Sequence, residues 1–246
     1  MTWSIVARDA ATGVFGVAVA TKFFAVGALC PHASSVGALA TQALINPTYG
    51  PRGLRLLAEG IDAPHIVAAL VEADAGRDTR QLHVMDRNGL LAAFTGADCV
   101  DWCGHTIAAD HSVAGNMLAG PRVIADTSAA YAANAKLPFP RRLIAAMKGG
   151  EAAGGDKRGK QSAALVICGA EEWPLLDLRV DDHADPLPEL DRLERVSRER
   201  YVHMRQFLPT RANPAGVYDR AKIEEGITAG LAAEAAATRT AAKAKV

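Results

Sequence analysis

The order of apolar segments along the chain limits the fold more than any single motif does. Short runs rich in valine and small residues, which are typical of buried strands, occur in clusters, and segments with helical spacing occur in pairs between these clusters. Strict alternation of strand and helix would predict a parallel sheet, whereas clustered strands predict an α+β protein with mostly antiparallel sheets. The expected strands cover residues 3–7, 14–21, 35–43, 81–96 (a hairpin around Asn88-Gly89), 162–170 and 175–182, and the expected helices cover residues 54–60, 66–74, 123–135 and 141–150.

The composition is that of an ordinary globular protein. The chain has 246 residues, of which 50% are hydrophobic, so it can form one large domain with an appendage. Lysine plus arginine and aspartate plus glutamate number 27 each, so no net charge would attract nucleic acid or an anionic membrane. No leader pattern and no run of roughly 20 apolar residues stands out. We therefore expect a cytoplasmic protein that acts on a small-molecule substrate.

Four cysteines are few for this length, and we expect reduced, mostly buried thiols. Cys99, Cys103 and His105 lie close together in "CVDWCGH", but their spacing does not match a paired zinc knuckle and no second ligand pair follows at a suitable distance. We expect no metal and no organic cofactor. His105 stays a candidate for substrate binding.

Thr2 follows the initiator methionine directly and stands at the head of the first expected strand. A threonine hydroxyl is a weak nucleophile, and a free α-amine on the same residue is one base that can activate it. An α-amine with a pKa of about 7.8 is roughly a tenth unprotonated at neutral pH, whereas a lysine near 10.4 is unprotonated in less than about one molecule in a thousand. Removal of Met1 would therefore make Thr2 a candidate nucleophile.

Lys22 and Asn116 are the candidate helpers of Thr2. Lys22 ends the second expected strand, which a hairpin brings beside the start of the first strand, where a cation lowers the pKa of an amine. The side-chain amide of Asn116, in "AGNMLAG", can donate to an oxyanion. A solvated lysine and a turn asparagine are the alternative interpretations.

The segment "GGDKRGKQ" at residues 154–161 resembles a phosphate-binding loop. Such a loop requires a strand before it and a helix after it, and here the expected order is reversed. Nucleotide binding is kept as an alternative.

Residues 187–246 differ in character from the rest of the chain. A one-sided apolar stripe at residues 187–208 predicts an amphipathic helix that docks on its own domain or on a second subunit, so we expect a homo-oligomer. The alanine-rich end predicts a fraying helix or disorder. We place the main domain at residues 1–186 and a helical extension with an alanine-rich tail at residues 187–246.

Several blocks of the chain, in this order, resemble an uncharacterised bacterial and archaeal family placed in the N-terminal nucleophile (Ntn) hydrolase-like fold: "TWSIVARDAATGVFGVAVATKFFAVGALCP", "VGALATQALINPTYGPRGL", "RQLHVMDRNGLLAAFTG", "WCGH", "GNMLAGP", "GGDKRGKQSAAL" and "DLRVDDHADP". The resemblance implies a four-layer αββα sandwich. It also implies Thr2 as nucleophile, Lys22 as electrostatic helper and Asn116 as oxyanion donor.

We therefore predict an amidohydrolase whose Thr2 attacks an amide carbonyl. The segment "TQALINPTYGPRG" is expected to wall the pocket, and the candidate substrate-binding residues are Gln42, Asn46, Tyr49, Arg52 and His105. Arg52 could hold a substrate carboxylate through two hydrogen bonds. The alternative is a non-catalytic binding or scaffold protein of the same fold that keeps Met1.

Overall fold

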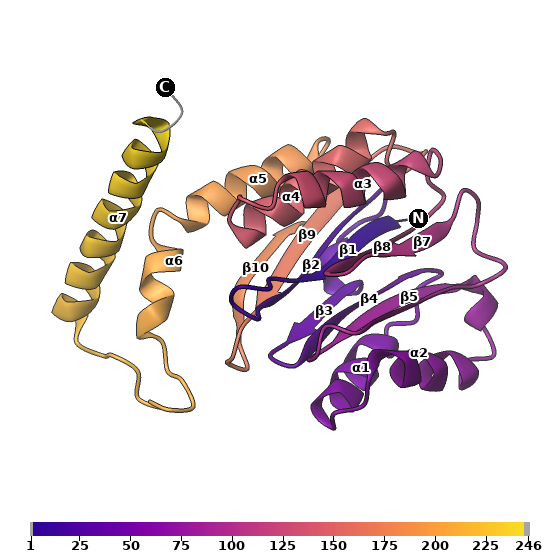
Figure 1. The fold of residues 1–246 in the computed structure, drawn as a ribbon, viewed down its shortest axis with the longest axis horizontal. Helices are drawn as coiled ribbons and strands as arrows, with labels where there is room; N and C mark the ends of the chain where they lie inside the picture. The colour runs from indigo at the N-terminus through magenta and orange to yellow at the C-terminus, as the bar shows by residue number, and fades with distance from the viewer. Residues whose placement is uncertain (1, 244–246) are drawn as a thin grey trace. The chain divides into compact units, whose positions relative to one another are not determined.

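The computed structural model describes residues 2–243, and in that range the chain is a mixed α+β protein with two antiparallel sheets (Figure 1). The strands are β1 (Thr2–Arg8), β2 (Phe15–Thr21), β3 (Pro31–Ser34), β4 (Gly37–Ala43), β5 (Arg80–Asp86), β6 (Leu91–Thr95), β7 (Gly104–Ile107), β8 (His111–Asn116), β9 (Ser162–Cys168) and β10 (Pro174–Val180). The α-helices are α1 (Tyr49–Ala58), α2 (Ala63–Glu72), α3 (Arg122–Ala133), α4 (Phe139–Ala152), α5 (Pro186–Ser197), α6 (Tyr201–Met204) and α7 (Arg220–Lys243). The predicted α+β class is confirmed.

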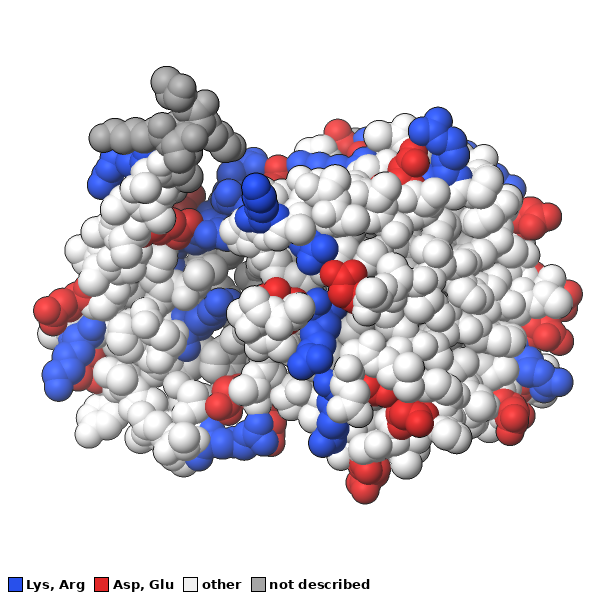
Figure 2. Space-filling view, in the orientation of Figure 1, with Lys and Arg blue, Asp and Glu red and all other residues white. Residues whose placement is uncertain are grey.

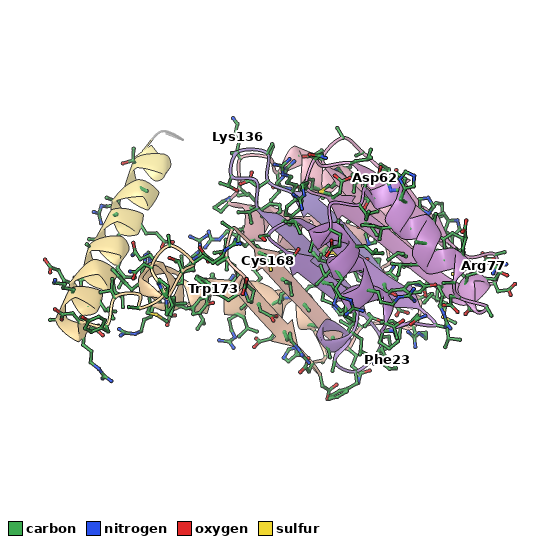
Figure 3. The ribbon with its side chains drawn as sticks, turned by 90° about the horizontal axis from the view of Figure 1, so that it is seen from below. Phe23, Asp62, Arg77, Lys136, Cys168 and Trp173 are labelled. Carbon is green, nitrogen blue, oxygen red and sulfur yellow. The ribbon has the colours of Figure 1, made fainter. Side chains whose placement is uncertain are left out.

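The first sheet has the strand order β10-β9-β2-β1-β8-β7, and all its described neighbours are antiparallel. Strand β1 lies in its interior, between β2 and β8. Thr2, the first residue of β1, pairs with Thr21 on one side and with Asn116 on the other. Opposite ends of the strands of this sheet are marked by labelled residues in Figure 3. Phe23, which follows β2, lies at one end, and Cys168 on β9 and Trp173 before β10 lie at the other.

The second sheet has the order β3-β4-β5-β6 and is also antiparallel. Strands β5 and β6 form the hairpin predicted from Asn88-Gly89, and Gly89 has the positive φ (84°) that this turn requires. Gln42 near the end of β4 pairs with Gln81 on β5. The short strands β3 and β7, and strand β8 of the first sheet, were not predicted from the sequence.

The two sheets face each other across an apolar core. Alternate residues of a strand point to opposite faces, so Val6, Val17 and Val19 of the first sheet pack with Ala40 and Met85 of the second. On the opposite face of the first sheet, a Cβ on Gly16 would lie 2.7 Å from Leu143, so a glycine lets α4 pack closely on β2. The same alternation that builds the core points Thr2 and Ser4 toward the second sheet.

Two pairs of helices cover the sheets. Helices α1 and α2 pack on β4, β5 and β6, and α3 and α4 pack together on β1, β2, β8 and β9 (Figure 1). Helix α1 begins at Tyr49, five residues before the helix predicted at residues 54–60. Pro51 lies in the first turn of the helix, where its missing N–H costs no hydrogen bond.

The chain divides into a unit up to Asp191 and a second unit from Arg192, and α5 crosses the division. In the second unit α6 and α7 pack together, and Glu234 on α7 binds Arg198 (2.8 Å) and His203 (3.1 Å).

Both acidic and basic side chains lie on the face seen in Figure 2. None of the helices in residues 2–243 combines the length and the apolarity that crossing a bilayer demands.

Candidate active site

Thr2 lies at the end of the inter-sheet space, with its side chain pointing between the two sheets. It is 5% exposed, and its hydroxyl donates to the hydroxyl of Thr21 at 3.2 Å. Thr21 is its cross-strand partner in the register of β1 and β2, so the sheet itself fixes this contact. This hydrogen bond restrains the orientation of the Thr2 hydroxyl.

Two side-chain amides hold the backbone of Thr2. Gln42 donates to the Thr2 carbonyl at 3.4 Å and Asn116 donates to it at 3.5 Å. The same two amides donate to the Oε1 atom of Gln81, at 2.7 Å and 3.1 Å. The Asn116 amide therefore faces the Thr2 carbonyl, and in this structure it holds the backbone of Thr2 in place.

Gln81 joins the two sheets at this end of the core. Its side chain is completely buried, and its Nε2 atom lies within 3.0 Å of three acceptors: the Thr95 hydroxyl and the carbonyls of Gly104 and Gly115. Buried amides are stable only when they are hydrogen-bonded. Gln81 therefore fixes the distance between the sheets beside Thr2, and nothing in its own sequence context signalled this role.

A second series of hydrogen bonds crosses the core at Ser4, two residues after Thr2 on β1. Ser4 lies between the Oε1 atom of Gln42 (2.6 Å) and Nε2 of His83 (2.9 Å), and Nδ1 of His83 contacts the Ser112 hydroxyl at 2.7 Å. Burial lowers the pKa of His83 to about 3, so the imidazole is neutral at physiological pH. Of its four members only Gln42 was selected from the sequence, because Ser4, His83 and Ser112 are distant from it and from one another along the chain.

The low pKa of His83 predicts a loss of stability in mild acid. Between pH 6.5 and 3 the unfolded chain binds a proton at this position and the folded chain does not, so the free energy of unfolding falls as the pH falls. The expected loss is about 2 kcal/mol between pH 6.5 and 5, measured by urea unfolding. His83→Gln should flatten this slope, whereas His65→Gln, which changes a side chain that is 79% exposed, should not. Equal slopes in both variants would contradict a buried, neutral His83.

Two cavities adjoin this network and share Ala43 and Leu44. The first has a volume of about 160 Å³ and contains Thr2. The second has a volume of about 330 Å³ and contains Asn116. The lining residues of the first are Thr2, Phe23, Val26, Leu29, Cys30, Gln42, Ala43, Leu44 and Ile45, and those of the second are Ala43, Leu44, Thr79, Asp98, Cys99, Val100, Asn116 and Met117.

The backbone around these cavities is strained. Among residues 2–243 the non-glycine residues with positive φ are Ala25 (52°), Ala43 (71°) and Met117 (51°). Ala43 and Met117 line the cavities, and Ala25 precedes Val26, which lines the first one. Such conformations cost free energy and persist where the surrounding structure imposes them, often at functional sites.

Comparison with known proteins assigns the family. The model of a family of unknown function, DUF1028, matches residues 2–190. The chain belongs to the DUF1028 family. It is 32% identical to a protein of the same family, SPO2555 from Silicibacter pomeroyi, whose crystal structure matches with a TM-score of 0.82 over 89% of this chain and 99% of that one.

Anbu, an ancestral beta-subunit from Yersinia bercovieri, is matched at 9% identity with a TM-score of 0.39, over 79% of this chain and 94% of that one. The search of curated proteins finds no match.

In this DUF1028 chain, the predicted helper Lys22 contacts the glycine-rich loop. Its backbone N–H donates to the carboxylate of Asp156 at 2.8 Å, and its ammonium donates to the carbonyl of Lys160 at 3.3 Å. The side chain is exposed. A direct contact with the Thr2 hydroxyl would require another side-chain conformation.

The loop at residues 154–161 follows α4 and precedes β9, so the helix-then-strand order expected from the sequence is observed. Lys157 donates to the carbonyl of Asp101 at 2.7 Å, and Lys160 binds the carboxylate of Asp185 at 2.5 Å. Because both lysines bind protein acceptors, this loop supports nucleotide binding poorly.

Asn46 and Tyr49, predicted to bind substrate, both bind Asp74 in this structure. The Asn46 amide and the Tyr49 hydroxyl each lie 2.9 Å from its carboxylate, and Arg80 binds it at 3.0 Å. The hydrogen bond from Asn46, together with those from Gly76, Arg80 and Tyr49, holds the pKa of Asp74 well below its usual range.

Arg52, in the first turns of α1, is half-buried and lines neither of the two cavities. Gln42 is the candidate that the structure brings to Thr2.

His105 lies on β7, and its Nδ1 atom contacts the Thr95 hydroxyl at 2.9 Å. Since Gln81 donates to the same hydroxyl, His105 is linked to the network rather than to Thr2 directly. Cys99 and Cys103 donate to backbone carbonyls, and the described residues contain no cluster that could hold a metal ion.

Proposed function

We propose that this DUF1028 protein is an Ntn-type amidohydrolase with the four-layer αββα arrangement of that class, and that Thr2 is its nucleophile. The observation that carries the proposal is the position of Thr2: its hydroxyl is held by Thr21 at the start of an interior strand and lines a cavity. The side chains of Gln42 and Asn116 hold the Thr2 carbonyl and so fix the nucleophile in a rigid sheet.

The proposed chemistry needs a free α-amine on Thr2, and hence removal of Met1, which lies outside the described residues. The amine accepts the hydroxyl proton as Oγ1 attacks the amide carbonyl carbon. The C–N bond then breaks, the proton passes to the leaving amine, and an ester of Thr2 remains. Water, deprotonated by the same amine, attacks this ester, releases the carboxylic acid and restores the hydroxyl.

We assign the role of base to the α-amine of Thr2, because the neighbouring His83 is bonded elsewhere, and the neighbouring Cys30 thiol does not compete with Thr2 as nucleophile. His83 is neutral but bonds to Ser4 and Ser112, away from the Thr2 hydroxyl. Burial raises the pKa of the Cys30 thiol to about 12, so Cys30 lines the cavity as a neutral group and is a poor competing nucleophile.

The proposal is tested by mass spectrometry of the N-terminal peptide after the native protein has been incubated with a β-lactone, which acylates activated threonines. We expect Met1 to be absent and Thr2 to carry the adduct, and we expect unfolded protein to stay unlabelled. If Met1 is retained, or if folded protein with a free Thr2 is not labelled, the protein is better described as a non-catalytic protein that binds a small ligand in the same cavity.

A further inference from the structure

The cavity beside Thr2 has an almost wholly apolar wall. Among its described lining residues, Phe23, Val26, Leu29, Leu44 and Ile45 present hydrocarbon, and none of the lining residues is charged. Apart from the free α-amine of Thr2 that the proposed function requires, the wall offers no charged group, so a charged or strongly polar group placed against the rest of the wall would lose its hydration without gaining a partner of opposite charge.

The polar side chains of Gln42 and Cys30 in the wall are hydrogen-bonded to other protein atoms. The Gln42 amide donates to the Thr2 carbonyl and to Gln81, and its Oε1 atom accepts from Ser4. The Cys30 thiol donates to that same Oε1 atom at 3.6 Å. Thr2 is therefore the residue whose polar groups the cavity offers to a ligand: its hydroxyl, which donates to Thr21 and is the proposed reacting group, and its proposed free α-amine.

The volume sets the size of the group that fits. A dry apolar cavity of about 150 Å³ holds one benzene molecule. The cavity of about 160 Å³ beside Thr2 therefore holds a six-carbon ring or a branched chain of four to six carbons. Phe23 (57% exposed), Leu29 (38%) and Leu44 (67%) leave apolar surface accessible at its edge.

We infer that the substrates are amides whose acyl part carries an uncharged apolar group of about four to six carbons, and that this group fills the cavity beside Thr2. The inference rests on the proposed function. The acyl part is assigned to this cavity because it stays bound to Thr2 through both half-reactions, while the amine leaves and water enters. The second cavity, with the exposed carboxylate of Asp98, is the more open of the two and suits that exchange.

A binding experiment tests the cavity without using the reaction. The full-length Thr2→Ala variant is titrated with acetamide, hexanamide, phenylacetamide and the anionic succinamate, and binding is followed by NMR chemical-shift changes. Hexanamide and phenylacetamide should bind at least about tenfold more tightly than acetamide, because they bury several more carbon atoms. Binding of succinamate equal to that of hexanamide, or equal binding of all four compounds, would overturn the inference.

A matched pair of variants locates the binding. Leu29→Trp narrows the cavity and should weaken hexanamide binding about tenfold or more, with little effect on acetamide. Leu90→Trp changes a side chain of similar exposure (49%) in the turn beside Asp86, at the opposite end of β5 from Gln81, and should have no effect. An unchanged hexanamide affinity in Leu29→Trp would place the bound compound elsewhere and contradict the inference.

The labelling rate then separates the two proposals. β-Propiolactone and its α-butyl and α-carboxymethyl derivatives leave different acyl groups on Thr2, and the α-butyl compound should label at least about tenfold faster than the other two. If all three label Thr2 at equal rates, the hydrolase proposal stands and the apolar cavity is not an acyl site. If none labels Thr2 while hexanamide binds, the cavity is apolar and selective but the hydrolase proposal fails.

Discussion

Thr2→Ala is expected to abolish amide hydrolysis and β-lactone labelling, with a loss of rate of about a thousandfold or more. The variant removes the hydroxyl that lines the cavity and keeps the strand, its register and the Gln42 and Asn116 contacts to the Thr2 carbonyl. The free energy of unfolding should change by only about 1 kcal/mol, the usual worth of one hydrogen bond. Alanine is small, so removal of Met1 should proceed as with threonine. The rate is measured on an amide that the wild-type protein cleaves, and stability is measured by urea unfolding.

Two further variants, Thr2→Ser and Thr21→Val, are the controls for the loss of activity in Thr2→Ala. Thr2→Ser keeps a hydroxyl and an amine and should keep measurable activity. Thr21→Val keeps the shape of the neighbour but removes the acceptor of the Thr2 hydroxyl, and should slow labelling about 5- to 10-fold. If Thr2→Ala retains the wild-type rate, the nucleophile lies elsewhere in the protein.

Among the variants proposed, Gln81→Leu should cause the largest fall in the free energy of unfolding, about 4 kcal/mol or more. Leucine removes the acceptor of the Gln42 and Asn116 amides and the donor to the Gly104 and Gly115 carbonyls. The two amides keep only the Thr2 carbonyl as acceptor, at the longer distances of 3.4 and 3.5 Å, and each buried polar group that loses its best partner costs about 1–3 kcal/mol. Because total stabilities are about 5–15 kcal/mol, a variant with this loss is close to unfolding at 37 °C. Urea unfolding at neutral pH measures the effect.

Gln161→Leu is the matched control, since it removes an exposed amide that bonds to Asp182 at 3.1 Å. Its effect should stay within about 0.5 kcal/mol. If Gln81→Leu is no more destabilising than this control, the two sheets are not held together by Gln81, and the positioning of Thr2 must have another origin.

The class of the fold could be predicted because it depends on local patterns. Valine-rich runs at residues 3–7 and 14–21 and the Asn88-Gly89 turn each carry their own signal, and all three form the expected strands or hairpin. Strands β3 and β7 were missed because four residues give too little periodicity to recognise. The start of α1 was missed because prolines and glycines at residues 47–53 usually break a helix, whereas here Pro51 falls in the first turn.

The candidate site was predicted only in part. Thr2, Asn116 and Gln42 were selected from the sequence, and the structure brings all three together. Asn46 and Tyr49 were selected because they are polar residues near a turn, but the structure directs both of them to Asp74. Residue type and local spacing do not reveal which partner a long polar side chain finds.

The sequence by itself determined the family, the α+β class and the position of Thr2 at the head of a strand, because these follow from residue order and from local backbone preferences. Only the tertiary structure decided what surrounds Thr2. Thr21, Gln42 and Asn116 come from three strands, and Gln81 joins them from a fourth. Their convergence depends on strand register and on the stacking of the sheets, where a shift of one residue would turn every side chain to the opposite face.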